Sequence, residues 1–331
     1  MARLILHILL CIITAAGQSS AVECSPAKPV ALPIKDVLVD PSIADSFMRG
    51  IPARIGSPPQ PIVLLPWPEL NNTWIYDGHA GCDPVLGLSE TTCRVRRGAY
   101  FSSDTSQSFK KTNDVVIAGG SANEITTLGT EVDVGRLVST SLGGTDVFAV
   151  GDDGDNSQQA VVNSMPLGVP RLNWDHGYTT LHTLGLGSDS VYLNALVKAG
   201  KIPSRVWSLF WGRTAGPNQI DGSIVLGGYD REKVVGQNYT QRLDYSEATG
   251  CWTGMKITVS GIEANFANGA NKNIIDKDQP LSVCLVPQRQ HLLEAPLSVQ
   301  SAFLAATSMK ATNLSFGLQW TDLLIDEGTT P

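Results

Sequence analysis

Two carboxylates stand in surroundings that could support hydrolytic chemistry. Glu69 closely follows the apolar run 61–65, and Asp326 opens the run Asp-Glu-Gly-Thr-Thr at 326–330. When two carboxylates share one proton, one takes a proton from water while the other gives one to a scissile amide. Such a pair requires two strand ends that meet, so the elements that precede each acid decide whether this chemistry is available.

Charge and composition argue against several other classes of function. The net charge is -7 and the sequence pI is about 5.2, so no basic surface for nucleic acid is expected and partners should be neutral or cationic. The acidic loop 151–156 lacks the spaced glutamate of a calcium loop, which favours a solvated loop. Neither Cys-x-x-Cys nor a paired-histidine spacing occurs. The sequence therefore predicts no metal and no cofactor.

The N-terminus has the pattern of an export signal. Arg3 precedes an apolar run from Leu4 to Ala15, and small residues at 19–21 offer a cleavage site. We expect a signal peptide over 1–21 and a secreted mature protein, with no stretch as long as the ~20 apolar residues of a transmembrane helix. N-glycosylation sequons occur at Asn71, Asn238 and Asn313.

Five cysteines follow the signal segment, and most should be paired in an oxidising compartment. Cys82 and Cys93 enclose a short polar loop, which predicts one disulfide. Cys251 and Cys284 lie on two apolar stretches that could be neighbouring strands, which predicts a second. Cys24 is left over, so its partner is expected outside this chain.

The elements that would position any acid are mostly strands. With 331 residues, 32 glycines and 19 prolines, the chain exceeds one comfortable core and favours two units of roughly 150 residues each. Short strands are predicted over 206–211 and 223–226, and a helix ending at Gly200 is predicted with one buried face. The buried face of this helix consists of Tyr192, Leu193, Leu196 and Val197. A second helix is predicted over 297–307.

The order of these pieces resembles the centre of the pepsin-like aspartic peptidases (peptidase A1). The matching pieces are Leu-Gly-Leu-Gly at 184–187, the helix, and Gly-Gly-Tyr-Asp at 227–230; Ile-Gly-Ser-Pro-Pro-Gln at 55–60 is similar to the turn that opens the family's first lobe. The resemblance covers about 49–307 and is closest to a fungal-type secreted member. It implies a mostly β, two-lobed fold of two β-barrels, with lobes at 22–190 and 191–331.

The same resemblance puts other residues at the catalytic positions. Counting back from Trp74 places Trp67 where the family has its first aspartate, and alignment on Leu292, Leu293 and Pro296 places Pro287 at the second. Glu69 and Asp326 are the substitute acids. Asp326 lacks a following strand, and the 44 residues after Pro287 are few for a second lobe, so that lobe is expected to be incomplete at its C-terminus.

Three functions follow as expectations. The first is a catalytically inactive, secreted, monomeric pepsin homologue that keeps the cleft between its lobes for a protein, peptide or polysaccharide ligand. The second is an active aspartic-type endopeptidase that uses Glu69 and Asp326. The third is a structural glycoprotein of the cell surface, held there by an anchor on a longer chain.

Overall fold

The computed structural model describes residues 27–68, 70–79, 82, 88–112, 141–152, 159–170, 181–213, 219–244, 251, 254–266, 268–287 and 295–307. Within these ranges the chain is mostly β, as the sequence predicts. The helices are α1 (Glu90–Arg96), α5 (Val191–Lys198) and α6 (Leu297–Thr307), with a short 3-10 turn η4 (Arg231–Lys233). The strands are β1 (Val30–Leu38), β2 (Phe47–Ile55), β3 (Gln60–Trp67), β4 (Thr73–Trp74), β5 (Lys110–Thr112), β6 (Leu142–Val150), β7 (Ala160–Val169), β8 (His182–Gly185), β9 (Trp207–Phe210), β10 (Gly222–Leu226), β11 (Lys256–Val259), β12 (Ile262–Asn265), β13 (Asn271–Ile275) and β14 (Leu281–Cys284).

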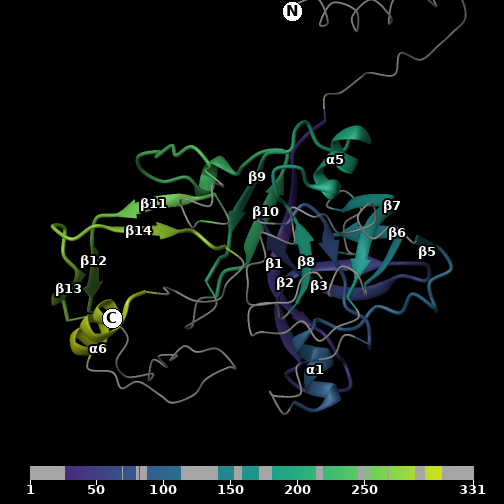
Figure 1. Cartoon of the computed structure of the whole chain (residues 1–331), viewed down its shortest axis with the longest axis horizontal. Helices are drawn as coiled ribbons and strands as arrows, with labels where there is room; N and C mark the ends of the chain where they lie inside the picture. The colour runs from purple at the N-terminus through teal and green to yellow at the C-terminus, as the bar shows by residue number, and fades with distance from the viewer. Residues whose placement is uncertain are drawn as a thin grey trace, which may run out of the picture.

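One large sheet organises the described N-terminal two thirds of the chain. Its ten strands run in the order β5-β6-β7-β4-β8-β3-β2-β1-β10-β9, and β6 also pairs with β2. That extra pairing closes six strands (β2, β3, β8, β4, β7 and β6) into a barrel, while β1, β10 and β9 continue outward from β2 (Figure 1). Closure removes two of the exposed strand edges that would otherwise invite pairing with another chain.

Alternation along the strands fills the barrel with apolar side chains. Ile62 and Leu64 of β3 belong to the main core, whereas Val63 and Leu65 belong to a second cluster on the opposite face. This is the period of two expected when successive side chains point to opposite faces of a sheet. β3 is thus buried on both faces, which explains its continuous run of apolar residues.

Helix α5 covers one side of the barrel. Tyr192 packs edge-to-face on Phe148 at 5.7 Å between ring centroids, and its hydroxyl donates to the carbonyl oxygen of Ala160 at 2.9 Å. Leu193 and Leu196 are buried with it, but the prediction for Val197 was wrong, since that side chain is exposed. Val197 follows Leu196 and therefore lies about 100° around the helix from it, beyond the edge of the buried stripe.

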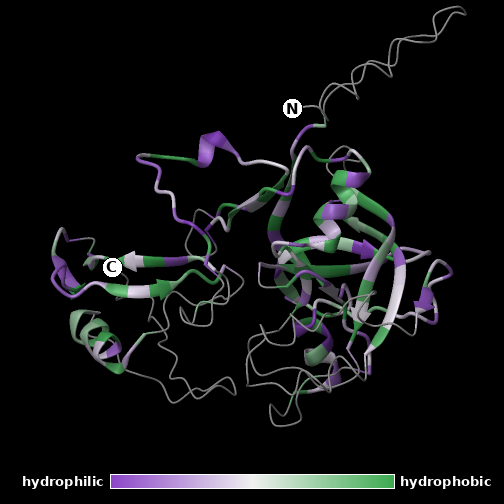
Figure 2. Cartoon of the chain, turned by 45° about the horizontal axis from the view of Figure 1, so that its top comes forward, coloured by the Kyte–Doolittle hydropathy of each residue, from purple (hydrophilic) through white to green (hydrophobic). Residues whose placement is uncertain are grey.

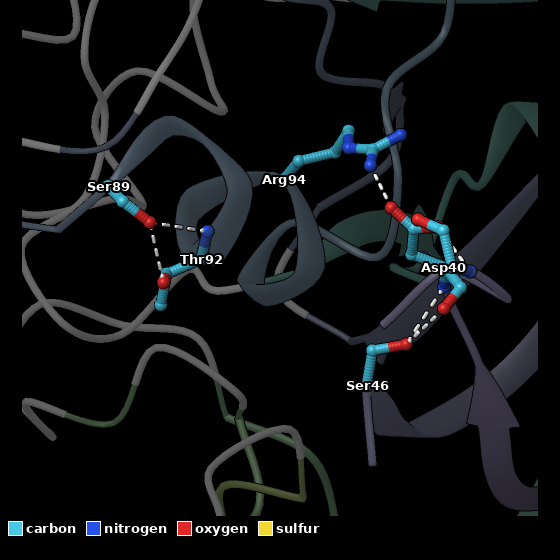
Figure 3. A network of polar contacts seen from close by, with 6 residues as sticks. Asp40, Ser46, Ser89, Thr92 and Arg94 are labelled. Atoms are coloured by element: carbon cyan, nitrogen blue, oxygen red, sulfur yellow. Dashed lines mark hydrogen bonds and ion pairs between the residues drawn. The ribbon is translucent and has the colours of Figure 1, made fainter. Parts of the chain in front are cut away.

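Helix α1 is linked to the β1–β2 turn by one ion pair (Figure 3) and to Cys82 by the disulfide of Cys93. The Ser89 hydroxyl caps the helix by accepting the Thr92 N–H at 3.1 Å, as N-cap serines do. Arg94 forms an ion pair with the buried carboxylate of Asp40, in the β1–β2 turn. Asp40 is held in place by Ser46, whose hydroxyl donates to the Asp40 carbonyl oxygen at 2.7 Å.

A smaller group of elements follows the large sheet, and we call it the C-terminal unit: β11 to β14 and α6. β11 pairs with β14 and β12 pairs with β13, both antiparallel. Helix α6 packs on β13 and has the bounds expected from the sequence. Figure 1 shows this unit to one side of the barrel. The described residues thus give a mostly β chain with one closed barrel, and the predicted division at 190/191 stays a prediction.

Candidate functional site

Trp67, at one of the two positions that the family resemblance marks as catalytic, is the last residue of β3. Strand β8 lies between β3 and β4, although β3 and β4 are neighbours in sequence. β8 runs parallel to β3, with Gly185 opposite Trp67, and antiparallel to β4, with Thr183 opposite Trp74. The turn that joins β3 to β4 must therefore cross the end of β8. We call the described residues of this turn, 67, 68 and 70–72, the crossing loop.

Two glycines allow this crossing to be tight. A Cβ atom on Gly185 would collide with the backbone of Asn72, and one on Gly187 would lie only 2.5 Å from Oδ1 of Asn71. Backbone hydrogen bonds fasten the two segments together: Leu186 N–H donates to the Trp67 carbonyl at 2.9 Å and Gly187 N–H to the Leu70 carbonyl at 2.8 Å. The Gly-Leu-Gly run singled out in the sequence is thus the segment that supports the strand end.

The Trp67 side chain is buried, with 4% of its surface exposed. By strand alternation it lies on the same face of β3 as Val63 and Leu65, away from the barrel interior. Leu70 in the crossing loop and Trp74 on β4 are fully buried as well. The end of β3 therefore carries a buried indole, whereas hydrolysis of an amide would need a carboxylate in contact with water.

Asn71 joins the crossing loop to α5. Its side-chain Oδ1 accepts the Asp189 N–H at 2.9 Å, and its backbone carbonyl accepts the Val191 N–H at 2.9 Å. Ser190, the N-cap of α5, donates its hydroxyl to the Gly185 carbonyl at 2.6 Å. The first N–H groups of a helix lack partners within the helix, so the loop, the glycine run and the helix start satisfy one another.

His182 is a buried residue of this region that no sequence motif identified. It precedes Thr183 on β8 and is fully buried, and its Nδ1 accepts the Tyr76 N–H at 2.9 Å. The guanidinium of buried Arg97 stands 4.0 Å from the centre of the Tyr76 ring. Burial, and then the positive charge of Arg97, lower the pKa of His182 from 6.5 to about 3. His182 is neutral near pH 7 and acts as a hydrogen-bond acceptor for the backbone.

Pro287, at the second family position, lies just after β14 and is linked to the large sheet by Trp211. The Trp211 indole N–H donates to the Pro287 carbonyl at 2.6 Å. Trp211 also packs against the cluster of Val63 and Leu65, on the face of β3 that carries Trp67. Arg49 on β2 fixes the position of Trp211 by donating to its carbonyl at 2.9 Å. Trp67 thus lies on the face of β3 to which Pro287 is linked through Trp211.

The other predicted site residues are distributed between described and undescribed parts of the chain. Cys82 is joined to Cys93 and Cys251 to Cys284, with Cα–Cα distances of 5.6 and 5.5 Å, which are the two pairings expected from the sequence. Asn71 is half-buried and Asn238 is exposed. The substitute acids Glu69 and Asp326, together with Cys24, Asn313 and the signal segment, lie outside the described residues.

The described ranges contain neither a cluster of metal ligands nor a membrane-spanning helix. No group of three or more His, Cys, Asp or Glu side chains there is arranged to hold a metal ion. Among the helices in those ranges, none is long and apolar enough to cross a membrane.

Comparison with known proteins does not supply a family. The chain matches no protein-family model, and no curated protein is similar to it at a significant level.

Proposed function

We propose that this chain is a secreted, two-lobed, pepsin-like glycoprotein without peptidase activity, which binds a protein, peptide or polysaccharide between its lobes. One observation carries the loss of activity: the position that the resemblance assigns to the first catalytic aspartate is a tryptophan with 4% exposure. An indole can neither take a proton from water nor give one to a leaving amine. Proline at position 287 has no ionisable side chain either.

The pepsin-like part of the proposal has its own support. The barrel is closed by β2 and β6, and the Gly-Leu-Gly run lies against the loop that leaves β3. The resemblance implies β-barrel lobes and a Gly-Leu-Gly turn followed by a helix, and the described residues contain a closed barrel and this run directly before α5. Secretion is supported by the two cysteine pairs, because disulfides persist mainly in oxidising compartments.

A scaffold without acids at positions 67 and 287 suits a binding role better than a catalytic one. Glycines at 185 and 187 let the crossing loop approach closely, because a Cβ atom at either position would collide with it. The strand end is thus tightly packed, and neither Trp67 nor Pro287 supplies an ionisable group.

Assay of the purified, secreted protein on a denatured protein substrate at acid pH tests the proposal, with an active pepsin-like peptidase as positive control. We expect no cleavage, and no effect of a pepstatin-type inhibitor. Cleavage that is lost in Glu69→Gln or Asp326→Asn would contradict the proposal and identify the substitute acids. Retention of the full-length protein at the cell surface without any binding of peptides or polysaccharides would favour the structural role instead.

A further inference from the structure

The two most exposed large apolar side chains of the described residues, Val235 and Tyr239, lie on one segment, 229–244, between β10 and the C-terminal unit. We call it the exposed segment. Apart from η4 it forms neither helix nor strand, and every residue from 231 to 244 is exposed. Its exposed apolar residues, with the exposed percentage of each, are Tyr229 (56%), Val234 (47%), Val235 (90%), Tyr239 (89%) and Leu243 (50%). Figure 2 shows a hydrophobic stretch directly after the hydrophilic η4.

Such an arrangement requires an explanation. Single exposed apolar residues are common on protein surfaces, but contiguous apolar patches normally mark a covered or interacting surface. An exposed segment with unpaired backbone and exposed Val and Tyr side chains can also pair with a strand of another molecule. Val235 and Tyr239, each with about nine tenths of its surface exposed, are therefore a risk for self-association unless something covers them.

The chain provides one candidate cover at the centre of the same segment. Asn238-Tyr239-Thr240 is a glycosylation sequon, and all three of its residues are exposed. The sequon at Asn71 is built differently, since Thr73 is fully buried and the Asn71 Oδ1 already accepts the Asp189 N–H. Of the two sequons in the described residues, only that of Asn238 leaves its whole acceptor sequence accessible.

We propose that Asn238 carries an N-linked glycan, and that this glycan covers Val235, Tyr239 and Leu243 and keeps the protein monomeric. The proposal rests on the secretion that is part of the proposed function. In the transfer, the Asn238 amide nitrogen bonds to C1 of the first sugar of a lipid-diphosphate-linked oligosaccharide. The C1–oxygen bond to the diphosphate breaks, and the amide gives up one proton as the lipid diphosphate leaves. A bulky, hydrated chain at this position separates the apolar side chains from those of other molecules.

The test uses the full-length chain, expressed through a secretory pathway. Thr240→Ala destroys the sequon with a small change at an exposed position, and Thr240→Ser preserves it, so the two form a matched pair. We expect wild type and Thr240→Ser to lose mass on treatment with an enzyme that removes N-glycans at position 238. Both should scatter light as monomers. Thr240→Ala should show no such loss, at least double its mass in light scattering, and bind more of a hydrophobic dye.

A third variant connects the association to the apolar side chains. Adding Val235→Ser and Leu243→Ser to Thr240→Ala should return the unglycosylated protein to the monomer. Absence of glycan at Asn238 in wild type and Thr240→Ser would overturn the site. A Thr240→Ala protein that stays monomeric with unchanged dye binding would overturn the covering role. The peptidase assay is independent of these outcomes, so failure of the proposed function and failure of this inference are distinguishable.

Discussion

The Trp67 side chain is buried at the end of β3, whereas a catalytic acid at this position would need contact with water. Its neighbours on the same face of β3, Val63 and Leu65, are buried and apolar, and its exposure is 4%. A carboxylate in this position would lose most of its hydration. Burial of an unpaired charge is among the costliest changes a core can undergo. The residue is thus part of the core.

Replacement of Trp67 by Asp should therefore destabilise the protein without restoring hydrolysis. We expect a loss of about 4 kcal/mol in the free energy of unfolding, from removal of a buried aromatic ring and burial of a carboxyl group. Trp67→Phe, the matched control, should lose about half as much or less. Urea unfolding at pH 7 measures both. A stable Trp67→Asp variant that cleaves the denatured substrate would show that the strand end is still a catalytic site.

His182 makes the stability of the folded protein decrease at acid pH. Its pKa is about 3 in the folded chain, against 6.5 for an ordinary histidine side chain. The neutral form is favoured in the fold, so the stabilisation is complete above pH 6.5 and is lost as pH falls from 6.5 toward 3. Each pH unit within that window costs up to about 1.4 kcal/mol from this one group.

Comparison of wild type with His182→Gln isolates this effect. Glutamine keeps a hydrogen-bond acceptor near the Tyr76 N–H but does not titrate. Between pH 7.5 and pH 4.5, wild type should lose about 3 kcal/mol more stability than the variant, because two pH units lie below 6.5. Urea midpoints at the two pH values provide the measurement. Equal losses in the two proteins would mean that His182 is not the group that titrates.

At the scale of elements, the insertion of β8 between β3 and β4 determines the local sequence. The crossing loop must pass over the end of β8, so a Cβ atom at Gly185 would overlap the backbone of Asn72. Backbone atoms in a fixed sheet register cannot move aside as a flexible side chain could. The same crossing positions the first turn of α5, through Asn71 and Ser190. A substitution at Gly185 would therefore disturb the packing of two strands and one helix.

Gly185→Ala should destabilise the protein by about 3 kcal/mol, the upper range for overpacking of a core. Gly78→Ala is the matched control, because nothing lies within 4 Å of a Cβ atom built there. Its effect should remain within about 0.5 kcal/mol, as for most surface substitutions. Thermal unfolding of the two variants beside wild type makes the comparison. Similar melting temperatures for both variants would refute the tight crossing.

At the scale of the whole molecule, the link from β9 to the C-terminal unit passes through Trp211. This residue follows β9, packs on the outer face of β3 and donates its indole N–H to Pro287. Arg49 supports it from β2. Because Pro287 directly follows the β11–β14 pair, the position of that pair relative to the large sheet depends in part on this one bond.

Trp211→Phe should loosen the C-terminal unit without loosening the barrel. Trp207→Phe is a matched control, since Trp207 donates the same kind of bond, at 3.0 Å, to the Leu186 carbonyl within the large sheet. Each substitution should cost about 1 kcal/mol of stability. Hydrogen exchange followed by mass spectrometry should show faster exchange over 256–284 in Trp211→Phe only. Faster exchange there in both variants, or in neither, would contradict the link.

Local patterns in the sequence determined the elements of this protein and part of its covalent structure. Hydrophobic period, turn residues and residue spacing are all contained within short stretches of sequence. They predicted the mostly β character, helix 297–307, the helix that begins near Tyr192 and the two cysteine pairs. The absence of an acid at position 67 could also be read from the order of residues around Trp74.

The tertiary structure decided what surrounds those residues. That Trp67 is buried, that His182 bonds the Tyr76 backbone, and that Trp211 connects to Pro287 all depend on contacts between segments distant in sequence. Neighbours of this kind leave no period or motif in a single chain, because each depends on sheet order and register. For the same reason the prediction that Val197 is buried was wrong. The hydrophobic period identifies the buried face of a helix, but the packing of that helix on the barrel determines how many residues of the face are buried.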